Sequence, residues 1–340
     1  MKRSAPTWTV VLIVVLGAVA VAMAIALSLV LAKRTVTRKK AAALQRIADT
    51  WAASSLMNIS VLDTSHKGGF GDNPATVVTS YYHVKGKASN EEYMRRMRIF
   101  FAIPCHLVIF TSPELVATMT ALREPFANRT RVISMPFSEL TSAQIMPLWK
   151  EHHEMVPHDV TYHIMSPDVY AIWAEKAYFL ERAAVLNAFG SNALIWLDAG
   201  YFRDEELAKS MQTFPSALRI RTLNPTMVHF VEVVPFKQKD RGDPYSSAFV
   251  LHLAGGAIVV HRDNATKFRE MYEVTRGMLV ARGNCVRIDE SVYNLMYLLR
   301  PDFVAAIHRT PWRGNGFFYL TWLLCDAMNI ADDEALAENE

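Results

Sequence analysis

One acidic side chain, Asp198, stands where the chemistry of this chain is expected. It ends an uninterrupted apolar run, residues 193–197, and precedes the small pair Ala199-Gly200. Such a run is typical of a strand buried on both faces of a sheet, and in open α/β sheets ligands bind beyond the carboxyl ends of these strands. Asp198 could there bind a metal ion or a sugar hydroxyl, and Gly200 would let a ligand approach the backbone. The alternative is that Asp198 caps the following helix.

A second acidic pair, Asp289-Glu290, opens a predicted helix over residues 289–299. A carboxylate can act as the general base that takes the proton of an attacking hydroxyl. Both residues are therefore candidate catalytic groups. Capping of the helix amino terminus by Asp289 is the alternative.

Three cations lie close to the predicted strand in sequence. Lys176 and Arg182 lie on the helix before it, and Arg203 follows it. A cation at such a strand end can offset phosphate charge, arginine as a planar fork and lysine as a point charge. Lys176 and Arg182 are six residues apart, which is not a whole number of helical turns, so we expect Lys176 to face the site. An exposed, solvated helix face is the alternative for both.

The elements that must position these residues alternate along the chain. Strands are predicted over residues 76–82, 106–110, 131–134, 193–197 and 303–307, with two strand-like pieces in 218–234 and a strand pair or bent strand over 247–260 around Gly255-Gly256. Helices are predicted over residues 89–101, 136–150, 169–187, 264–281 and 289–299. Alternating strands and helices indicate an α/β protein with a mostly parallel sheet covered by helices. The Gly255-Gly256 pair fits a close approach of a sugar to the backbone, or a β-bulge.

The histidines and cysteines indicate less about the function of the protein. The histidines at 152, 153, 158 and 163 match no helical face and no zinc finger, which favours a solvated loop over residues 151–167. Cys105 is expected to be buried as a small apolar side chain. A Cys285–Cys325 disulfide is compatible with an oxidising compartment only.

The amino-terminal part of the chain differs from the rest. Residues 4–32 carry no charge, and residues 8–31 are almost wholly apolar. About 20 such residues cross a bilayer as a helix, whereas the apolar core of a cleavable signal peptide, the alternative, has only about 7–15. The predicted order is a short tail 1–7, a transmembrane signal anchor 8–31, a basic helical stem 32–72, a globular domain 73–325 and an acidic tail 326–340.

The charge is also unevenly distributed. Residues 1–50 contain eight Lys/Arg and one acid, and the whole chain carries a net charge of +3, so the remainder is net negative. This excludes a basic nucleic-acid-binding domain. The cations after the apolar segment favour a cytosolic domain, whereas the glycosylation triplets at Asn58, Asn128 and Asn264 favour a lumenal one.

The string Trp196-Leu-Asp-Ala-Gly-Tyr-Phe-Arg203 is the most specific motif of the chain. It is supported by Trp173-Ala-Glu-Lys176, Ala75-Thr-Val-Val-Thr-Ser-Tyr-Tyr82, Leu107-Val-Ile-Phe-Thr111, Gly255-Gly256, Asp289-Glu290, Asn294 and Pro301-Asp302. Over roughly residues 73–310 the chain resembles the HtrL/YibB family, which is grouped with nucleotide-sugar glycosyltransferases of the GT-A fold. The resemblance implies a GT-A-like (Rossmann-like), mixed but mainly parallel sheet covered by helices.

The same resemblance implies a nucleotide-sugar donor and positions for its parts. Thr79, Ser80, Tyr81 and Thr111 would line the nucleotide site. The residues expected to contact the rest of the donor are Lys176, Asp198, Gly200, Arg203, Gly255 and Gly256. Asp289 or Glu290 would face the acceptor, which could be a glycan, a lipid or a protein.

A metal ion is the implied cofactor, with one complication. GT-A enzymes commonly hold Mn²⁺ or Mg²⁺ with an Asp-x-Asp pair at this strand end, and the metal neutralises the diphosphate. Here Asp198-Ala-Gly200 lacks the second acid. Asp204 or His308, which stands before a Pro-Trp pair, could supply another ligand, although His308 could equally be a partly exposed residue. Alternatively, Arg203 or Lys176 could offset the phosphate charge without a metal.

The expected function is that of a membrane-anchored glycosyltransferase in the Golgi or secretory pathway, with a lumenal carboxyl-terminal domain. The missing second acid motivates one alternative, a catalytically inactive, membrane-tethered protein that binds nucleotide-sugars or glycans. The basic segment 33–46 motivates another, a cytosol-facing scaffold that binds anionic lipid. Glycans on Asn128 or Asn264 would exclude the scaffold.

Overall fold

The computed structural model describes residues 70, 75–155, 165–308 and 316–325. The predicted anchor 8–31, most of the stem 32–72 and the tail 326–340 lie outside these residues. Within the described residues, no helix has both the length and the apolar character needed to cross a bilayer.

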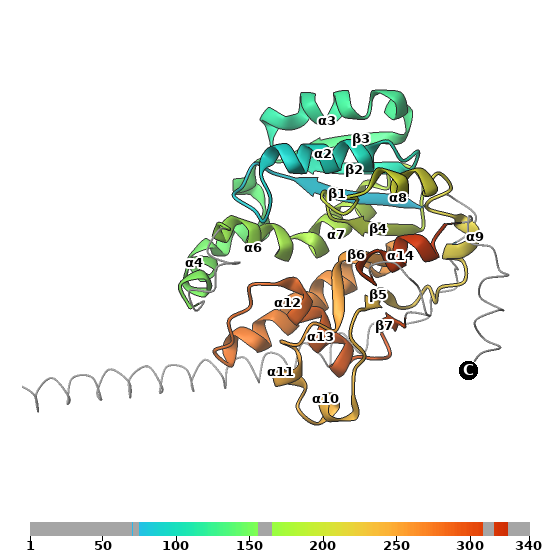
Figure 1. Ribbon diagram of the computed structural model, residues 1–340. Coiled ribbons are helices and arrows are strands. Elements are labelled where there is room, and N and C mark those ends of the chain that lie inside the picture. The colour runs from blue at the N-terminus through green and yellow to red at the C-terminus, as the bar shows by residue number, and fades with distance from the viewer. Residues whose placement is uncertain (1–69, 71–74, 156–164, 309–315, 326–340) are drawn as a thin grey trace, which may run out of the picture.

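A single seven-stranded sheet forms the centre of the domain (Figure 1). Its strands are β1 Thr76–Tyr81, β2 His106–Thr111, β3 Thr130–Ser134, β4 Ala193–Leu197, β5 Val228–Glu232, β6 Leu253–His261 and β7 Val304–Ile307. They lie in the order β3-β2-β1-β4-β6-β5-β7, and only β6 runs antiparallel to its neighbours. The prediction of a mixed, mainly parallel α/β sheet is confirmed.

The strand order reverses between β1 and β4. From β1 the chain builds β2 and β3 outward on one side and then returns to place β4 on the other side, with Thr76 opposite Leu194 and Val78 opposite Trp196. Every residue of β1 and β4 is buried, as the apolar run of β4 requires. A reversal of this kind leaves a crevice at the carboxyl ends of the two strands, where α/β proteins bind ligands.

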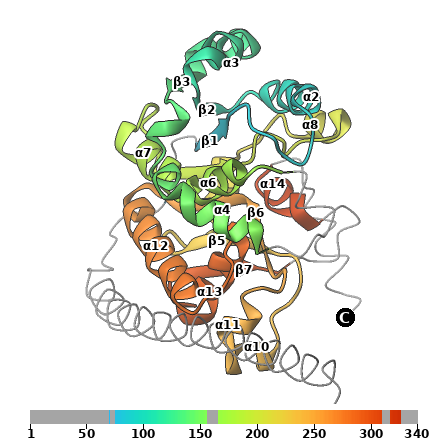
Figure 2. The same cartoon turned by 90° about the vertical axis from the view of Figure 1, so that its left-hand side faces the viewer.

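Helices cover both faces of the sheet (Figure 2). They are α2 Asn90–Phe101, α3 Val116–Leu122, α4 Met146–Glu154, α6 Pro167–Ala174, α7 Lys176–Leu186, α8 Glu205–Ser210, α9 Ala217–Ile220, α10 Gln238–Gly242, α11 Pro244–Ser247, α12 Ala265–Ala281, α13 Asp289–Leu299 and α14 Tyr319–Leu323. One apolar core joins the sheet to α7, α12 and α13, and a second joins it to α2, α8 and α14. Both faces of the sheet are therefore removed from water, which explains the nearly continuous apolar strands.

The predicted helix over residues 169–187 is wrong in one respect that matters for the site. It is two helices, α6 and α7, separated at Glu175. The buried carboxylate of Glu175 accepts hydrogen bonds from the backbone N–H groups of Thr141 and Ser142, at 3.1 and 2.7 Å. These tertiary contacts leave no trace in the local apolar pattern, and the break makes Lys176 the first residue of α7.

Other predicted segments also need correction. The histidine-rich region begins as helix α4, in which His152 is buried with Nδ1 3.1 Å from the carbonyl oxygen of Val286, so it is not a solvated loop residue. In the predicted helix over residues 136–150, residues 137–139 and 141–145 form short 3₁₀ turns, and the α-helix α4 begins only at Met146. Residues 218–234 contain one strand, β5, and α11 precedes the single strand β6. Cys285 and Cys325 both keep their thiols, so the disulfide is not formed.

Candidate functional site

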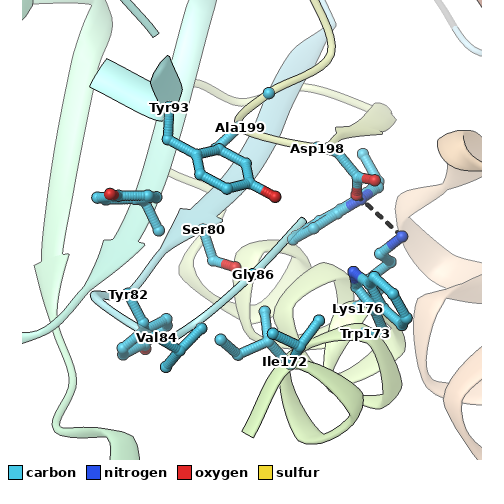
Figure 3. Close-up of a pocket in the computed structure, with 14 residues that line it drawn as sticks. Ser80, Tyr82, Val84, Gly86, Tyr93, Ile172, Trp173, Lys176, Asp198 and Ala199 are labelled. Carbon is cyan, nitrogen blue, oxygen red and sulfur yellow. Dashed lines mark hydrogen bonds and ion pairs between the residues drawn. The ribbon is translucent and has the colours of Figure 1, made fainter. Parts of the chain in front are cut away.

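Two adjoining hollows lie at the carboxyl ends of β1 and β4. We call them the inner pocket, of ≈ 90 Å³, and the outer pocket, of ≈ 320 Å³. They share five lining residues, namely Tyr93, Trp173, Lys176, Asp198 and Gly200. Figure 3 shows Ser80 and Tyr93 on one side of the inner pocket, with Trp173, Lys176 and Asp198 on the other. The site therefore lies at the point where the strand order reverses.

The Lys176 side chain is the centre of the charged part of this site. Only 2% of it is exposed, and its ammonium nitrogen, Nζ, lies 2.9 Å from Asp198 Oδ1 and 2.8 Å from Asp289 Oδ2. Nζ also donates a hydrogen bond to the carbonyl oxygen of Gly255 at 2.8 Å. An ammonium group has three N–H donors, and here three oxygens surround it.

Elements distant in the sequence supply these oxygens. Asp198 follows β4, and its backbone N–H extends the β4–β6 pairing by donating to the carbonyl oxygen of Gly256 at 3.0 Å. Gly255 lies near the start of β6, which meets the carboxyl end of β4 because the two strands are antiparallel. Asp289 is in the first turn of α13, whose N-cap is Ile288. Neither acid is the helix cap that the sequence left as an alternative. The N-cap of α13 is Ile288 and not Asp289, and the N-cap of α8, the helix after Asp198, is Asp204.

Asp198 is the acid of the pair that a ligand can reach. Its side chain is 37% exposed, and Trp196 Nε1 donates a hydrogen bond to Oδ1 at 2.8 Å. Burial of the rest of the group raises the pKa of Asp198, against the lowering effect of Lys176. Asp198 thus presents a fixed carboxylate to the outer pocket.

Asp289 lies deeper, and its side chain is only 2% exposed. Burial is the main cause that raises the pKa of its carboxyl from 3.8 to about 7, and the Lys176 ammonium opposes this shift while Glu290 adds to it. Glu290 is less buried than Asp289 and lines the outer pocket beside it. Of the predicted catalytic pair, Glu290 is therefore the more accessible.

The rim of the outer pocket carries further cations. Lys87, Arg96 and Arg203 line it, and Lys87 and Arg203 are exposed. Lys87 Nζ also lies 5.0 Å from the centre of the Trp173 ring. With Lys176, four cationic side chains face the three acidic ones in this pocket. This charge arrangement suits a ligand that carries both phosphate and hydroxyl groups.

The inner pocket is more aromatic. Tyr81, Tyr82, Tyr93, Trp173 and Trp196 all line it. Ser80 lines it too, and its Oγ atom is buried without a hydrogen-bond partner, which is the condition of a polar group awaiting a ligand. The hydroxyl of Tyr82 is likewise buried without a partner. Flat apolar walls with unpartnered hydroxyls suit a planar heterocycle.

The remaining predicted residues are placed as follows. Thr79 is buried and lines neither pocket, whereas Tyr81 lines the inner one and donates to Asn90 Oδ1 at 3.3 Å. The Thr111 hydroxyl donates to the carbonyl oxygen of Tyr81 at 2.7 Å, so it supports β1 rather than lining a pocket. Arg182 forms an ion pair with Glu175.

His308 is not brought together with Asp198. It follows β7, three strands away from β4, forms an ion pair with Glu232, and lines neither pocket. Asp204 caps α8 by accepting from the backbone N–H of Glu206 at 2.9 Å. Neither of the two additional metal ligands that the sequence offered therefore lines the pockets that contain Asp198.

The described residues do not fit the predicted metal. They contain no group of three His, Cys, Asp or Glu side chains arranged to hold an ion. The two acids that do approach each other, Asp198 and Asp289, have the Lys176 ammonium between them. Two acids that already share a buried cation are a poor ligand set for a second one.

Sequence reasoning missed several lining residues. Tyr93 and Arg96 lie on α2, and Phe317 and Phe318 lie near the carboxyl end of the described chain. Their segments carry no motif, and only the folding of distant elements onto one edge of the sheet brings them to the site. Trp173 was part of a recognised motif, but an apolar aromatic on a helix is usually a core residue.

The fold and the site together define an α/β protein with a charged, aromatic-lined cleft where its strand order reverses. A family model described as "Bacterial protein of unknown function (HtrL_YibB)" matches residues 74–318, and the chain belongs to this family. A curated relative, Protein HtrL of Escherichia coli (strain K12), is 22% identical over 255 residues, which cover 67% of this chain and 85% of that protein. The predicted family resemblance is thereby confirmed.

A comparison with solved structures finds mouse xyloside xylosyltransferase 1 in its apo form. The match covers 74% of this chain and 94% of that chain, with 10% sequence identity and a TM-score of 0.39.

The two neighbouring glycines of β6 give a first prediction. A Cβ atom on Gly255 would lie 2.8 Å from Asp289 Oδ2 and 3.2 Å from Tyr293, whereas one on Gly256 would meet only Tyr201 and Asp198 at 3.4 Å or more. We expect Gly255→Ala to lower the free energy of unfolding by about 1–3 kcal/mol, because it overpacks a buried contact. Gly256→Ala should lower the free energy of unfolding by clearly less. Urea denaturation of both variants measures this, and equal losses would contradict the assigned contact.

Asp289 gives a second prediction, on the pH dependence of stability. The folded protein keeps a proton on Asp289 up to about pH 7, whereas the unfolded chain releases it near 3.8. The stability that Asp289 contributes is therefore complete below about pH 4 and is lost as the pH rises toward 7. Relative to Asp289→Asn, the wild-type free energy of unfolding should fall between pH 5 and pH 8 by an amount on the order of 1–3 kcal/mol.

Asp302→Asn is the control for this measurement. A hydrogen bond from Arg300 lowers the pKa of Asp302, so Asp302 is ionised in both states across this interval. The difference in free energy of unfolding between Asp302→Asn and wild type should therefore not change with pH. If the difference in free energy of unfolding between Asp289→Asn and wild type also stays constant with pH, Asp289 titrates in its ordinary range.

Proposed function

We propose that the protein is a glycosyltransferase that transfers a sugar from a nucleotide-sugar donor to a hydroxyl of an acceptor. One observation carries this proposal: a continuous cleft joins an aromatic pocket, a rim of cations and a set of carboxylates. These three surfaces correspond in chemistry to a nucleobase, a diphosphate and a sugar. The GT-A-like fold that the family resemblance implies supports the same assignment.

The donor would extend across both pockets. Its base would stack against Tyr93 and Trp173 in the inner pocket, with the Ser80 hydroxyl available for a hydrogen bond. Its diphosphate would lie at the rim, where Arg96 and Arg203 can offset the phosphate charge. Asp198 lines both pockets, and its partly exposed carboxylate would accept hydrogen bonds from sugar hydroxyls of the donor.

Glu290 is the proposed general base. In a direct displacement, the acceptor oxygen bonds to the anomeric carbon, and the bond from that carbon to the diphosphate oxygen breaks. The electron pair of the broken bond leaves with the nucleoside diphosphate, and the proton of the acceptor hydroxyl moves to Glu290. Asp289 is too buried for this role and instead positions Lys176.

Turnover of nucleotide-sugars tests this proposal. The full-length protein, purified in detergent, would be mixed with UDP-, GDP- and CMP-sugars, and release of free nucleotide would be measured. We expect Glu290→Gln to lower kcat by about 10²–10⁴ with little change in donor binding, because it removes only the base. Asp198→Asn should weaken donor binding itself. Glu206→Gln, at an exposed site on α8, is the control and should behave as wild type.

The two outcomes that contradict the proposal have different meanings. A folded protein that binds no nucleotide-sugar would exclude the proposed donor. Donor binding without turnover, for every acceptor class offered, would favour the alternative of an inactive binding protein.

We further propose that residues 8–31 anchor the protein in a membrane of the secretory pathway with the catalytic domain in the lumen. The apolar composition of this segment supports the anchor. Of the predicted glycosylation sites, Asn128 is exposed. Asn264 is buried and donates a hydrogen bond to the carbonyl oxygen of Pro225 at 2.9 Å, which leaves no room for a glycan.

Glycan mapping in a eukaryotic cell tests this orientation. We expect a glycosidase-sensitive mass shift that Asn128→Gln reduces and Asn264→Gln does not, provided that Asn264→Gln folds. Absence of any glycan on Asn128, in a protein shown to be membrane-bound, would support a cytosolic domain instead.

A further inference from the structure

We propose that Lys176 is a built-in counter-cation that takes the place of a divalent metal ion between Asp198 and Asp289, so that the site binds its nucleotide-sugar without Mn²⁺ or Mg²⁺. This inference rests on the proposed function and specifies its cofactor requirement. It departs from the Mn²⁺ or Mg²⁺ that the family resemblance implied.

The geometry around Nζ is the first argument. The ammonium lies 2.9 and 2.8 Å from one oxygen of each acid, and it donates to the Gly255 carbonyl oxygen at 2.8 Å. These distances are those of charge-assisted contacts. Because the Lys176 side chain is 2% exposed, solvent cannot replace any of the three oxygens, and the cation is a permanent part of the site.

Charge is the second argument. A divalent ion between Asp198 and Asp289 would have to lie within a few ångströms of the Lys176 ammonium. Two like charges so close inside a protein repel each other strongly, since the low dielectric screens them poorly. Oxygen ligands must also approach Mg²⁺ to about 2.0–2.1 Å, and Asp198 Oδ1 already accepts from both Lys176 and Trp196 Nε1.

The surroundings give the third argument. Where the Asp-x-Asp motif has its second acid, this chain has Gly200, and a Cβ atom there would lie 2.9 Å from a ring carbon of Tyr93. A side chain that could complete a metal site would fit at this position only if Tyr93 moved. Arg203 is exposed at the rim of the same pocket, beside Arg96, which pairs with Glu92, so a side-chain cation is available for a diphosphate.

Two measurements on the full-length protein in detergent test the inference. The first is binding of the nucleotide-sugar donor identified by turnover, or of UDP if several donors react, in excess EDTA and in excess Mn²⁺. We expect wild-type dissociation constants that agree within about twofold, and at least about a tenfold loss for Lys176→Met in EDTA. Lys209→Met, at an exposed lysine of α8, is the matched control and should bind as wild type.

The second measurement is a titration of the protein with Mn²⁺ alone, followed by electron paramagnetic resonance of the free ion. Wild type and Asp198→Ala should give the same signal, because the site takes up no ion. Lys176→Met should gain a bound ion, because it removes the ammonium and leaves the carboxylates. If this variant does not fold, the wild-type, Asp198→Ala and EDTA results still decide the question.

The outcomes separate the inference from the proposed function. Wild-type binding that requires Mn²⁺, or an Mn²⁺ site lost in Asp198→Ala, would overturn the inference and leave the glycosyltransferase intact. Failure of every nucleotide-sugar to bind under either condition would overturn the proposed function itself.

Discussion

The buried ammonium of Lys176 is the interaction on which the rest of the site depends. It joins α7, the end of β4, the start of β6 and the first turn of α13 through three oxygens. Burying a charge is costly unless it is paired and hydrogen-bonded. Removal of one partner from such a cluster typically costs about 3–5 kcal/mol, because it leaves an uncompensated buried charge. The same contacts therefore hold the cleft in shape and fix where Asp198 presents its carboxylate.

The antiparallel direction of β6 is the constraint that makes this cluster possible. Since β6 runs against β4, its first residues lie beside Asp198 at the carboxyl end of the sheet, with Leu197 opposite Ala257. Gly255 can then turn its carbonyl oxygen to Lys176 and leave room for Asp289. The irregularity predicted for the glycine pair is found, because the pairing of β5 with β6 shifts register between His229 and Val231, whose partners Val259 and Ala254 flank the two glycines. Close packing and irregular pairing occur in the same stretch.

A site that carries its own cation has consequences for ligand recognition. A metal ion must be captured with the donor, whereas the lysine is always present and holds both acids before any ligand arrives. Preorganised charges of this kind avoid the cost of rearrangement on binding. The matching arrangement of aromatic rings in the inner pocket and cations at the rim makes the cleft suited to a ligand with a flat base, a charged centre and a polar sugar.

The sequence by itself determined the elements with strong local signals. Ser89, the first residue of the predicted helix 89–101, caps α2, with its hydroxyl accepting from the backbone N–H of Glu92 at 3.2 Å. The strands β1, β2 and β4 lie close to their predicted positions. The motif around Asp198 also identified the family. These features depend on a few neighbouring residues, so a single chain displays them.

Only the tertiary structure decided what Lys176 does. Its sequence neighbourhood is compatible with an exposed helix face, and nothing near residue 176 indicates that it meets Asp289, more than a hundred residues away. The break at Glu175 depends on backbone N–H groups of a distant turn, and the separation of His308 from Asp198 depends on the strand order. Contacts between residues far apart in sequence arise from the topology of the sheet, which no local pattern encodes.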